Sequence, residues 1–533
     1  MTTLRPRTAG DVVNVLFPIV LLGLVTVWGL TSLWLPFGWD QSCFGYVANT
    51  ILHGGMPYRD AWDFKGPLPF YVYAALQLVF GRQMWAVRAL DLVLLATAAS
   101  FAVRLLRQFI SPRAALTTAL MIALAFANFG NWYTAQPDGW AALALIIVAA
   151  LLLDPAGISR RSAVVVGLLL AAATLVKPLY ATYLLLVPCA AWPSNAEERR
   201  ALAKTLGVTL GSFALPLLLT IGWFAAHGIL FDFYDVHVRF NFERLATDPH
   251  LKMSVLRASV ITFGILTAVP LIATTLPAAA AGAGVLLGER RNAAFTLLLW
   301  AALSLGQIAA QRKFLSQNYS WHALYPPLGM LAGIGLGKLW AATRSRLDPM
   351  RWLIVVVVLL LFKQVSHEPA GQIATWLRYA SGRSDLAQYQ SRFEVDVPAM
   401  NGGSATDFGF SVPRDLKIAA YFQAHSAASD KVLLWSDPLV NYLSDRAAIT
   451  PVTAPAALTV WGSESRRARY RTQLLTELGS DSAAKLFAVP LKDLAPGSDD
   501  TNLPTLFPEL ISALDAHYDV ATTIGDVRIY QRR

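Results

Sequence analysis

The chain has few charged residues for its length. Only 15% of its 533 residues are Asp, Glu, Lys or Arg, whereas 55% are hydrophobic and the mean hydropathy is +0.46. A soluble globular protein of this size is less apolar and more highly charged. The composition therefore predicts a polytopic α-helical membrane protein.

Several chemical signatures are also missing. The two cysteines, Cys43 and Cys189, have no metal spacing and provide no disulfide framework. No His/Cys/Asp cluster has zinc spacing, no glycine-rich phosphate loop occurs, and no order of Ser, His and Asp indicates a nucleophile. A nucleotide-driven mechanism is therefore disfavoured. The net charge of +10 comes from scattered basic pairs without interleaved aromatic residues, which is not the pattern of a nucleic-acid surface.

What the chain has instead is a series of long apolar runs. Runs near the ~20 residues that a helix needs to cross hydrocarbon predict about eleven membrane spans. These spans lie at 12–35, 84–108, 114–129, 135–153, 160–175, 178–193, 203–226, 257–286, 292–310, 320–342 and 351–367. The first is too long for a signal-peptide core and lacks a cleavage site, so we expect a retained anchor. The run 257–286 is long enough to tilt, or to break at Pro270 or Pro277.

Basic residues gather in alternate gaps between these runs, and cytoplasmic loops are the ones enriched in Lys and Arg. With Arg5 and Arg7 in the cytoplasm, every short inner gap is basic. Those gaps contain Arg104, Arg107, Arg113, Arg160, Arg161, Arg199, Arg200, Lys204, Arg290, Arg291, Lys338, Arg344, Arg346 and Arg351. An odd number of spans then places the termini on opposite sides of a bacterial inner membrane. The gaps on the other side, of which 36–83 and 227–256 are long, are mixed in sign, and we expect them to form one outward-facing polar cavity.

The composition changes near residue 368 to ordinary mixed polar sequence. Short apolar runs at 431–435, 486–489 and 527–530 predict strands, and the segments from 413, near 463–478 and near 505–516 predict helices. We therefore expect two domains: a transmembrane domain at 1–368, and a soluble extracytoplasmic α/β domain at 369–533.

The first outer loop, 36–83, is the part richest in candidate chemistry. It contains Phe37-Gly38-Trp39-Asp40-Gln41, and then Gly54-Gly55-Met56-Pro57-Tyr58-Arg59-Asp60-Ala61-Trp62-Asp63-Phe64-Lys65-Gly66-Pro67-Leu68. Ionisable groups at a membrane boundary are costly unless they line a wet cavity or bind a ligand. The loop is therefore the predicted catalytic segment.

Each charged residue of the loop has two interpretations. Apolar residues at helical spacing predict a short helix from Asp40, which is either its N-cap or a catalytic base. Asp60, Asp63 and Lys65 form either a local salt-bridge cluster, with Arg59, or a substrate site in which the lysine holds a lipid phosphate at the head-group level. Asp138, which begins a later span, is a helix N-terminal carboxylate or a site residue, and His322 is structural or functional.

In these motifs the chain resembles a known family. Trp39-Asp40, Gly55-x-Pro57-Tyr58-x-Asp60, Trp62-Asp63-x-Lys65-Gly66-Pro67-Leu68 and Pro137-Asp138 are similar to motifs of the polyprenyl-phosphate-sugar-dependent glycosyltransferases of the C-type (GT-C) membrane superfamily. That group contains protein O-mannosyltransferases and the lipid A aminoarabinose transferase. The resemblance covers about residues 1–370, and a trailing outer α/β domain is usual in bacterial members.

The resemblance implies an activity and roles for single residues. Asp40 would be the general base for the acceptor hydroxyl, and Asp138 would shape the acceptor or donor site. Lys65 matches the lysine of a Lys-Pro-Pro motif that contacts the donor phosphate, although the tripeptide here is Lys65-Gly66-Pro67. The first position is Asp40-Gln41, so the second carboxylate present in many relatives is absent. The resemblance points to metal-independent members, although Asp40 and Asp138 could share a divalent ion.

The residues also fit this chemistry without the family. A sugar on a polyprenyl phosphate is already activated, so one base and one cationic clamp suffice for transfer with inversion to a lipid, glycan or protein acceptor. Candidate phosphate ligands besides Lys65 are Arg239, Arg244 and Arg312, and candidate substrate contacts are Tyr58, Asp60, Asp63 and His322.

Two alternative functions remain. A lipid-linked sugar flippase or transporter should have mid-span charges or paired repeats, which the chain lacks, and a non-catalytic envelope assembly protein would not explain the first loop.

Overall fold

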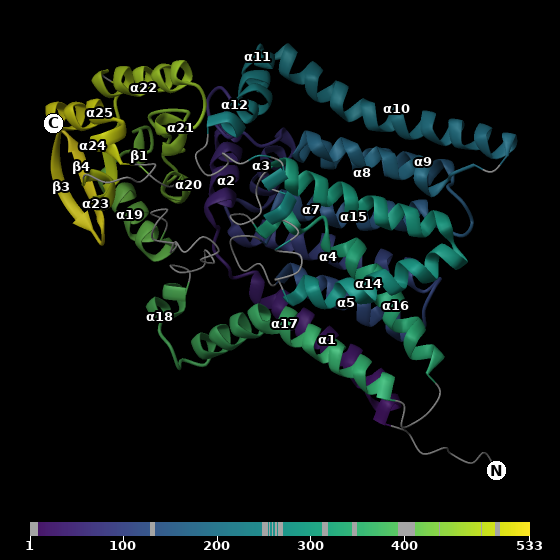
Figure 1. Ribbon diagram of the computed structural model, residues 1–533. Coiled ribbons are helices and arrows are strands. Elements are labelled where there is room, and N and C mark those ends of the chain that lie inside the picture. The colour runs from purple at the N-terminus through teal and green to yellow at the C-terminus, as the bar shows by residue number, and fades with distance from the viewer. Residues whose placement is uncertain are drawn as a thin grey trace. The chain divides into compact units, whose positions relative to one another are not determined.

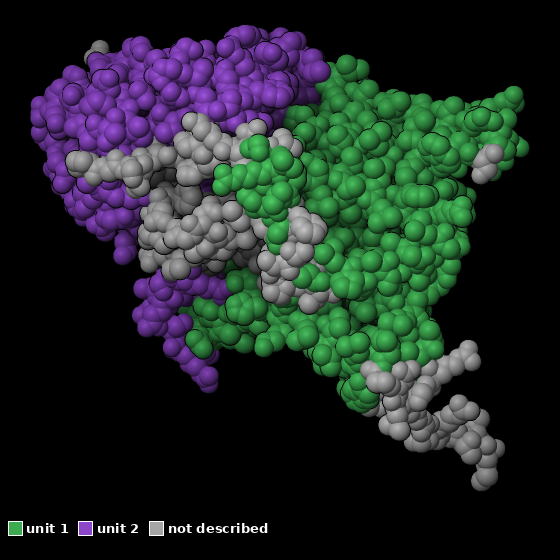
Figure 2. Space-filling model, in the orientation of Figure 1, with its two compact units in different colours: residues 1–35, 87–219, 254–380 green, residues 36–86, 220–253, 381–533 purple. Residues whose placement is uncertain are grey.

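The computed structural model of the protein is mostly helical, with one small sheet near the C-terminus (Figure 1). The structure describes residues 9–127, 134–193, 195–247, 254, 256–257, 259–261, 264, 270–311, 318–343, 349–392, 411–435, 438–480, 482–495 and 502–533. The chain forms two compact units, which Figure 2 colours separately. Unit 1 contains residues 1–35, 87–219 and 254–380, and unit 2 contains residues 36–86, 220–253 and 381–533.

Unit 1 consists of apolar helices. They are α1 (Ala9–Ser32), α4 (Met84–Leu106), α5 (Pro112–Ala127), α7 (Pro137–Leu152), α8 (Arg160–Val176), η1 (Pro178–Leu185), α9 (Leu186–Ala190), α10 (Ala196–Ala226), α14 (Pro270–Glu289), α15 (Arg291–Gln311), η4 (Asn318–Trp321), α16 (Tyr325–Ala342) and α17 (Pro349–Ala380). Two of the boundaries between the units fall inside helices, near the start of α4 and within α10.

Small residues allow the helices of unit 1 to pack closely. A Cβ on Gly282 of α14 would lie 1.9 Å from the carbonyl oxygen of Leu331 on α16, and one on Gly335 would lie 2.3 Å from that of Ala278. Glycine at such contacts lets two helix backbones approach, as in other membrane bundles. Elsewhere α1, α5 and α17 enclose an apolar cluster that includes Leu21.

Five of the described helices are long and apolar enough to cross a membrane. They are Val15–Ser32, Met84–Leu106, Ala196–Ala226, Arg291–Gln311 and Met350–Ala380, and shorter apolar helices lie at Pro67–Phe80, Pro112–Ala127, Pro137–Leu152 and Pro178–Ala190. The number of eleven spans stays a prediction. Much of the predicted span 257–286 lies outside the described residues before Pro270, where α14 begins.

Unit 2 joins the first loop to the C-terminal part of the chain. The first loop provides α2 (Trp39–Leu52) and α3 (Pro67–Phe80), and the segment 220–253 provides α11 (Leu230–Phe233), the π-helix η2 (Tyr234–Arg239) and α12 (Phe240–Thr247). The C-terminal helices are α18 (Leu386–Ser391), α19 (Val412–His425), α20 (Leu439–Ser444), α21 (Pro455–Thr459), α22 (Glu464–Gly479), α23 (Leu491–Leu494), α24 (Leu503–Leu506) and α25 (Pro508–His517). Asn49 of α2 donates to the Asp445 carboxylate (3.1 Å), and Tyr46 Oη accepts from the Ala448 amide (2.8 Å).

The sheet of unit 2 has the order β1-β2-β4-β3. β1 (Val432–Leu434) is parallel to β2 (Leu486–Pro490), which pairs antiparallel with β4 (Val527–Arg532), and β4 pairs antiparallel with β3 (Tyr518–Ile524). The three runs predicted as strands form β1, β2 and β4. Their apolar side chains pack against Ile418 and Phe422 of α19, whose N-cap is Ser411.

Candidate functional site

The loop between α2 and α3 is held in a fixed shape by Tyr58. This residue has φ +72°, which is uncommon for a side chain other than glycine. Its amide donates to the Ala61 carbonyl oxygen (2.8 Å), and its hydroxyl donates to the Lys65 carbonyl oxygen (3.0 Å). The ring is 3% exposed and packs against Phe70, Phe224 and Phe233. Tyr58 therefore positions Lys65, and its predicted contact with substrate stays a prediction.

Asp40, Asp63 and Lys65 come together in unit 2. The Lys65 amide donates to Asp63 Oδ1 (2.7 Å), and Lys65 Nζ lies 3.7 Å from Asp40 Oδ2. All three side chains are buried, and the Lys65 ammonium lies 5.8 Å from the ring centroids of both Phe44 and Phe64. The site thus holds a cation and a carboxylate side by side, in surroundings where their interaction is stronger than in water.

Asp40 is not the N-cap of its helix. Gly38 occupies that position, and its amide donates to Gln41 Oε1 (3.1 Å). Asp40 lies in the first turn of α2, where a carboxylate is stabilised by the helix dipole. The capping interpretation was wrong because the helix begins at Trp39, one residue before its apolar stripe. The side chain of Asp40 is therefore not needed to cap the helix.

Burial raises the pKa of Asp63 to about 6, although Lys65 and Arg244 act in the opposite direction. Burial also lowers the pKa of His237, whose Nδ1 donates to the Phe64 carbonyl oxygen (3.1 Å). Asp63 is thus a carboxyl group that changes its charge in the neutral to mildly acidic range, next to the candidate cation.

A second cation, Arg244, belongs to the same part of unit 2. Its guanidinium carbon lies 4.7 Å from the Phe64 ring centroid and 3.9 Å from that of Trp461, and the side chain is buried. Arg239 is placed differently: it forms ion pairs with Asp235 (3.7 Å) and Glu243 (3.0 Å) and is half exposed. The third predicted arginine, Arg312, lies outside the described residues.

Asp60 lies at the surface of the loop. Both of its carboxylate oxygens accept hydrogen bonds from Arg59, and Oδ2 also accepts one from the Met56 amide (2.7 Å). The salt bridge anticipated between Arg59 and Asp60 is therefore present. Its side chains are 48% and 35% exposed, so it contributes little to stability.

Asp138 and His322 form a separate cluster in unit 1. Asp138 begins α7, is 1% exposed, and accepts hydrogen bonds from Lys177 and from the Tyr180 hydroxyl (2.6 Å). His322 stacks on Phe126 with a centroid distance of 4.9 Å. From the sequence, both residues are open between a structural and a functional role, and the structure brings them into one electrostatic neighbourhood.

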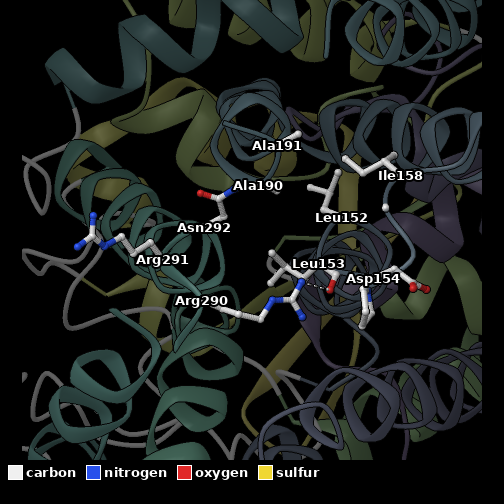
Figure 3. Close-up of a pocket in the computed structure, with 11 residues that line it drawn as sticks. Leu152, Leu153, Asp154, Ile158, Ala190, Ala191, Arg290, Arg291 and Asn292 are labelled. Carbon is white, nitrogen blue, oxygen red and sulfur yellow. Dashed lines mark hydrogen bonds between the residues drawn. The ribbon is translucent and has the colours of Figure 1, made fainter. Parts of the chain in front are cut away.

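A cavity of about 480 Å³ lies elsewhere in unit 1 (Figure 3). Its lining includes Leu153, Asp154 and Arg290, and Arg290 donates to the Leu153 carbonyl oxygen (3.3 Å). The cavity contains none of the predicted site residues, and its arginines are those of a predicted inner gap.

Within the residues that the structure describes, no group of three or more His, Cys, Asp or Glu side chains is placed to hold a metal ion.

Comparison with solved structures identifies the fold. Neither a family model nor a curated protein sequence matches the chain. Crystal structures of ArnT from Cupriavidus metallidurans, in the apo state and bound to undecaprenyl phosphate, match with TM-scores of 0.58 and 0.59 at 14% identity, over 96% of this chain and 97% of ArnT. The chain has the ArnT fold. Archaeal oligosaccharyltransferase AglB from Archaeoglobus fulgidus, in complex with an inhibitory peptide and a dolichol-phosphate, matches with a TM-score of 0.48 at 12% identity, over 96% of this chain and 74% of AglB.

The ArnT fold confirms the predicted GT-C type of architecture, and together with the apolar helices it makes the chain a membrane protein.

Two residues near the site escaped sequence reasoning. Trp461 and Arg466 lie at the start of a segment whose many charges are typical of a solvated helix face, yet Arg466 is only 4% exposed. Nothing in their local sequence indicates that they face the 220–253 segment.

Proposed function

We propose that the protein is an integral-membrane glycosyltransferase that moves a sugar from a polyprenyl-phosphate donor to a lipid, glycan or protein acceptor. The buried pair of Asp40 and Lys65, with Arg244 close to the same Phe64 ring, is the observation that carries this proposal. The ArnT fold, seen also in a crystal structure bound to undecaprenyl phosphate, agrees with it.

The pair provides the two functions that the reaction needs. The acceptor hydroxyl attacks the anomeric carbon while its proton passes to the Asp40 carboxylate. The bond between that carbon and the phosphate oxygen breaks, and its electron pair leaves with the phosphate. The lipid phosphate therefore gains negative charge, which the ammonium of Lys65 and the guanidinium of Arg244 stabilise. Direct attack from the opposite face inverts the anomeric centre.

The same pair also suggests how donor binding prepares the base. Before the donor binds, the Lys65 ammonium lies against Asp40. A donor phosphate competes for that ammonium, which leaves the Asp40 carboxylate to accept the acceptor proton.

We place this site on the extracytoplasmic face, because the basic gaps of the sequence are assigned to the cytoplasm. The resemblance assigns Asp138, which Lys177 and Tyr180 hold within unit 1, to shaping the acceptor or donor site.

The test uses the full-length protein purified in detergent. It is incubated with a panel of polyprenyl-phosphate sugars and an envelope extract that supplies acceptors, and mass spectrometry follows donor consumption and release of the lipid phosphate. We expect one donor to be consumed by the wild type. Asp40→Asn should reduce transfer by ~10²-fold or more, the usual range for a positioned general base.

The Asp40→Asn variant should keep its thermal stability and still bind undecaprenyl phosphate, because asparagine is nearly isosteric and Gly38 is the N-cap. Asp60→Asn is the matched control, since Asp60 belongs to the same loop but lies in an exposed salt bridge. Near-normal transfer by Asp40→Asn would exclude Asp40 as the base and direct attention to Asp63 or Asp138. Failure of the wild type to consume any donor would contradict the proposed activity.

A further inference from the structure

The starting observation is the contact of Arg244 with two aromatic rings, which themselves meet edge to face. The ring of Phe64 comes from the first loop, next to Lys65, and the ring of Trp461 comes from the turn before α22. A guanidinium 3.9 Å from a tryptophan centroid makes a close cation–π contact, which is strongest when desolvated. The rings orient the guanidinium without neutralising its charge.

The segment that carries Trp461 is attached to α12 on both sides of Arg244. The Gly462 amide donates to Thr247 Oγ1 (3.0 Å), and the Ser463 amide donates to Glu243 Oε2 (3.1 Å). Gly462 has φ +82°, and a Cβ there would lie 3.2 Å from Phe240. The turn therefore needs glycine, and it places Trp461 directly over the last part of α12.

Arg466 holds the carboxylates that flank this arrangement. Its guanidinium donates to Glu243 (2.8 and 3.2 Å) and to Asp235 (2.6 and 2.8 Å), and its side chain is 3% exposed. Charge-assisted hydrogen bonds of this bidentate kind stabilise the contact and also fix the relative orientation of the two groups. Because Arg466 engages Glu243, the carboxylate next to Arg244 in the sequence is held by another cation.

The first loop is fixed to the same C-terminal region. The Trp62 amide donates to the Pro451 carbonyl oxygen (3.0 Å), and the Trp62 ring packs against Tyr470 with a centroid distance of 6.4 Å. Residues 451–470 thus contact both segments that carry the candidate phosphate ligands, the one with Lys65 and the one with Arg244.

We propose that Trp461 is a positioning residue of the donor site: it holds the Arg244 guanidinium in the orientation that binds the lipid phosphate. This inference rests on the proposed function. It makes the C-terminal region part of the donor site rather than an independent acceptor module.

The experiment measures binding of undecaprenyl phosphate to full-length protein in detergent, from the rise in thermal unfolding midpoint with lipid concentration. Trp461→Leu, which fills space without a π face, should weaken binding about 10- to 30-fold, in line with a desolvated cation–π contact. Trp461→Phe keeps an aromatic face and should bind within about 3-fold of the wild type. Arg244→Ala should weaken binding at least as much as Trp461→Leu.

A double-mutant cycle separates positioning from general support of the fold. If Trp461 acts through Arg244, the Trp461→Leu/Arg244→Ala double variant binds no more weakly than Arg244→Ala alone. Trp435→Phe is the matched control, because Trp435 is a buried tryptophan directly after β1 that packs against Phe507. It should leave lipid binding unchanged. Should Trp461→Leu fail to fold, the cycle is run with Trp461→Met, which also lacks a π face.

Three outcomes overturn the inference while leaving the donor assignment intact. The first is that Trp461→Leu binds undecaprenyl phosphate with wild-type affinity. The second is that Trp461→Leu and Trp435→Phe lose affinity equally. The third is that the affinity losses of Trp461→Leu and Arg244→Ala multiply in the double variant. If the wild type itself does not bind undecaprenyl phosphate, the proposed donor is wrong, and the role of Trp461 is excluded with it.

Discussion

Asp63 is a candidate site residue whose charge depends on its surroundings. Its side chain is 3% exposed, and burial raises its pKa to about 6. Below that value it is neutral, and the field around Lys65 is more positive. Above it the carboxylate offsets part of the lysine charge. The charge around the candidate phosphate ligand Lys65 therefore depends on a neighbour whose pKa is about 6.

This titration predicts a pH dependence of donor binding. A polyprenyl-phosphate sugar is a phosphodiester with one negative charge throughout the neutral range, so changes in its affinity report on the protein. We expect the donor KM to rise as the pH increases from 5 to 7, because ionised Asp63 repels the phosphate. Steady-state kinetics with a saturating acceptor measure this.

The Asp63→Asn variant should remove most of this dependence and keep the low KM at both ends. His237 needs a control of its own, because it contacts the Phe64 carbonyl oxygen and burial lowers its pKa. His237→Gln should retain the rise. A pH profile of Asp63→Asn that matches the wild type would assign the titration to another group.

Local patterns were sufficient to select Asp40, Asp63 and Lys65 as candidates that the structure brings together, because all three lie in one loop whose charges stand out between apolar runs. They were insufficient for Arg466, which pairs with Asp235 across 231 positions. Helical spacing and charge runs describe a segment's own faces, and they carry no information about which distant segment covers a face. The same limit applies to the stacking of Trp461 on Arg244.

At the scale of elements, α17 shows what hydropathy does and does not predict. The apolar run ends near residue 367, but the helix continues to Ala380. Mean hydropathy predicts where a segment leaves hydrocarbon, whereas a helix ends where its backbone hydrogen bonds end. The predicted domain boundary at 368 therefore falls inside a continuous helix.

The turn between α21 and α22 predicts a stability difference between two glycines. Gly462→Ala places a Cβ at φ +82°, 3.2 Å from Phe240 and from Arg466, and should cost about 1–3 kcal/mol. Gly479→Ala, at the other end of α22, meets nothing within 4 Å and should be neutral or slightly stabilising. Thermal unfolding in detergent compares the two. Equal midpoints for both variants would show that the turn tolerates a side chain.

At the scale of the whole molecule, the charge distribution predicts which side of the membrane the C-terminal region occupies. Basic inner gaps and an odd number of spans place residues after Ala380 outside the cytoplasm. A reporter that is active only in the periplasm, fused after Arg533, should be active, and one that works only in the cytoplasm should be silent. The reverse pattern would move the first loop to the cytoplasmic side and exclude an extracytoplasmic site.

The hydrogen bond between Trp62 and Pro451 joins residues that leave the ribosome far apart in time. At about 5–20 residues per second, roughly 20–80 s separate the synthesis of the two. The first loop must wait through this interval without the contacts that later hold it, while the helices between are made and inserted. A nascent chain that stalls before residue 451 would thus carry Asp40 and Lys65 without an assembled site, and activity would begin only after the last part of the protein has been translated.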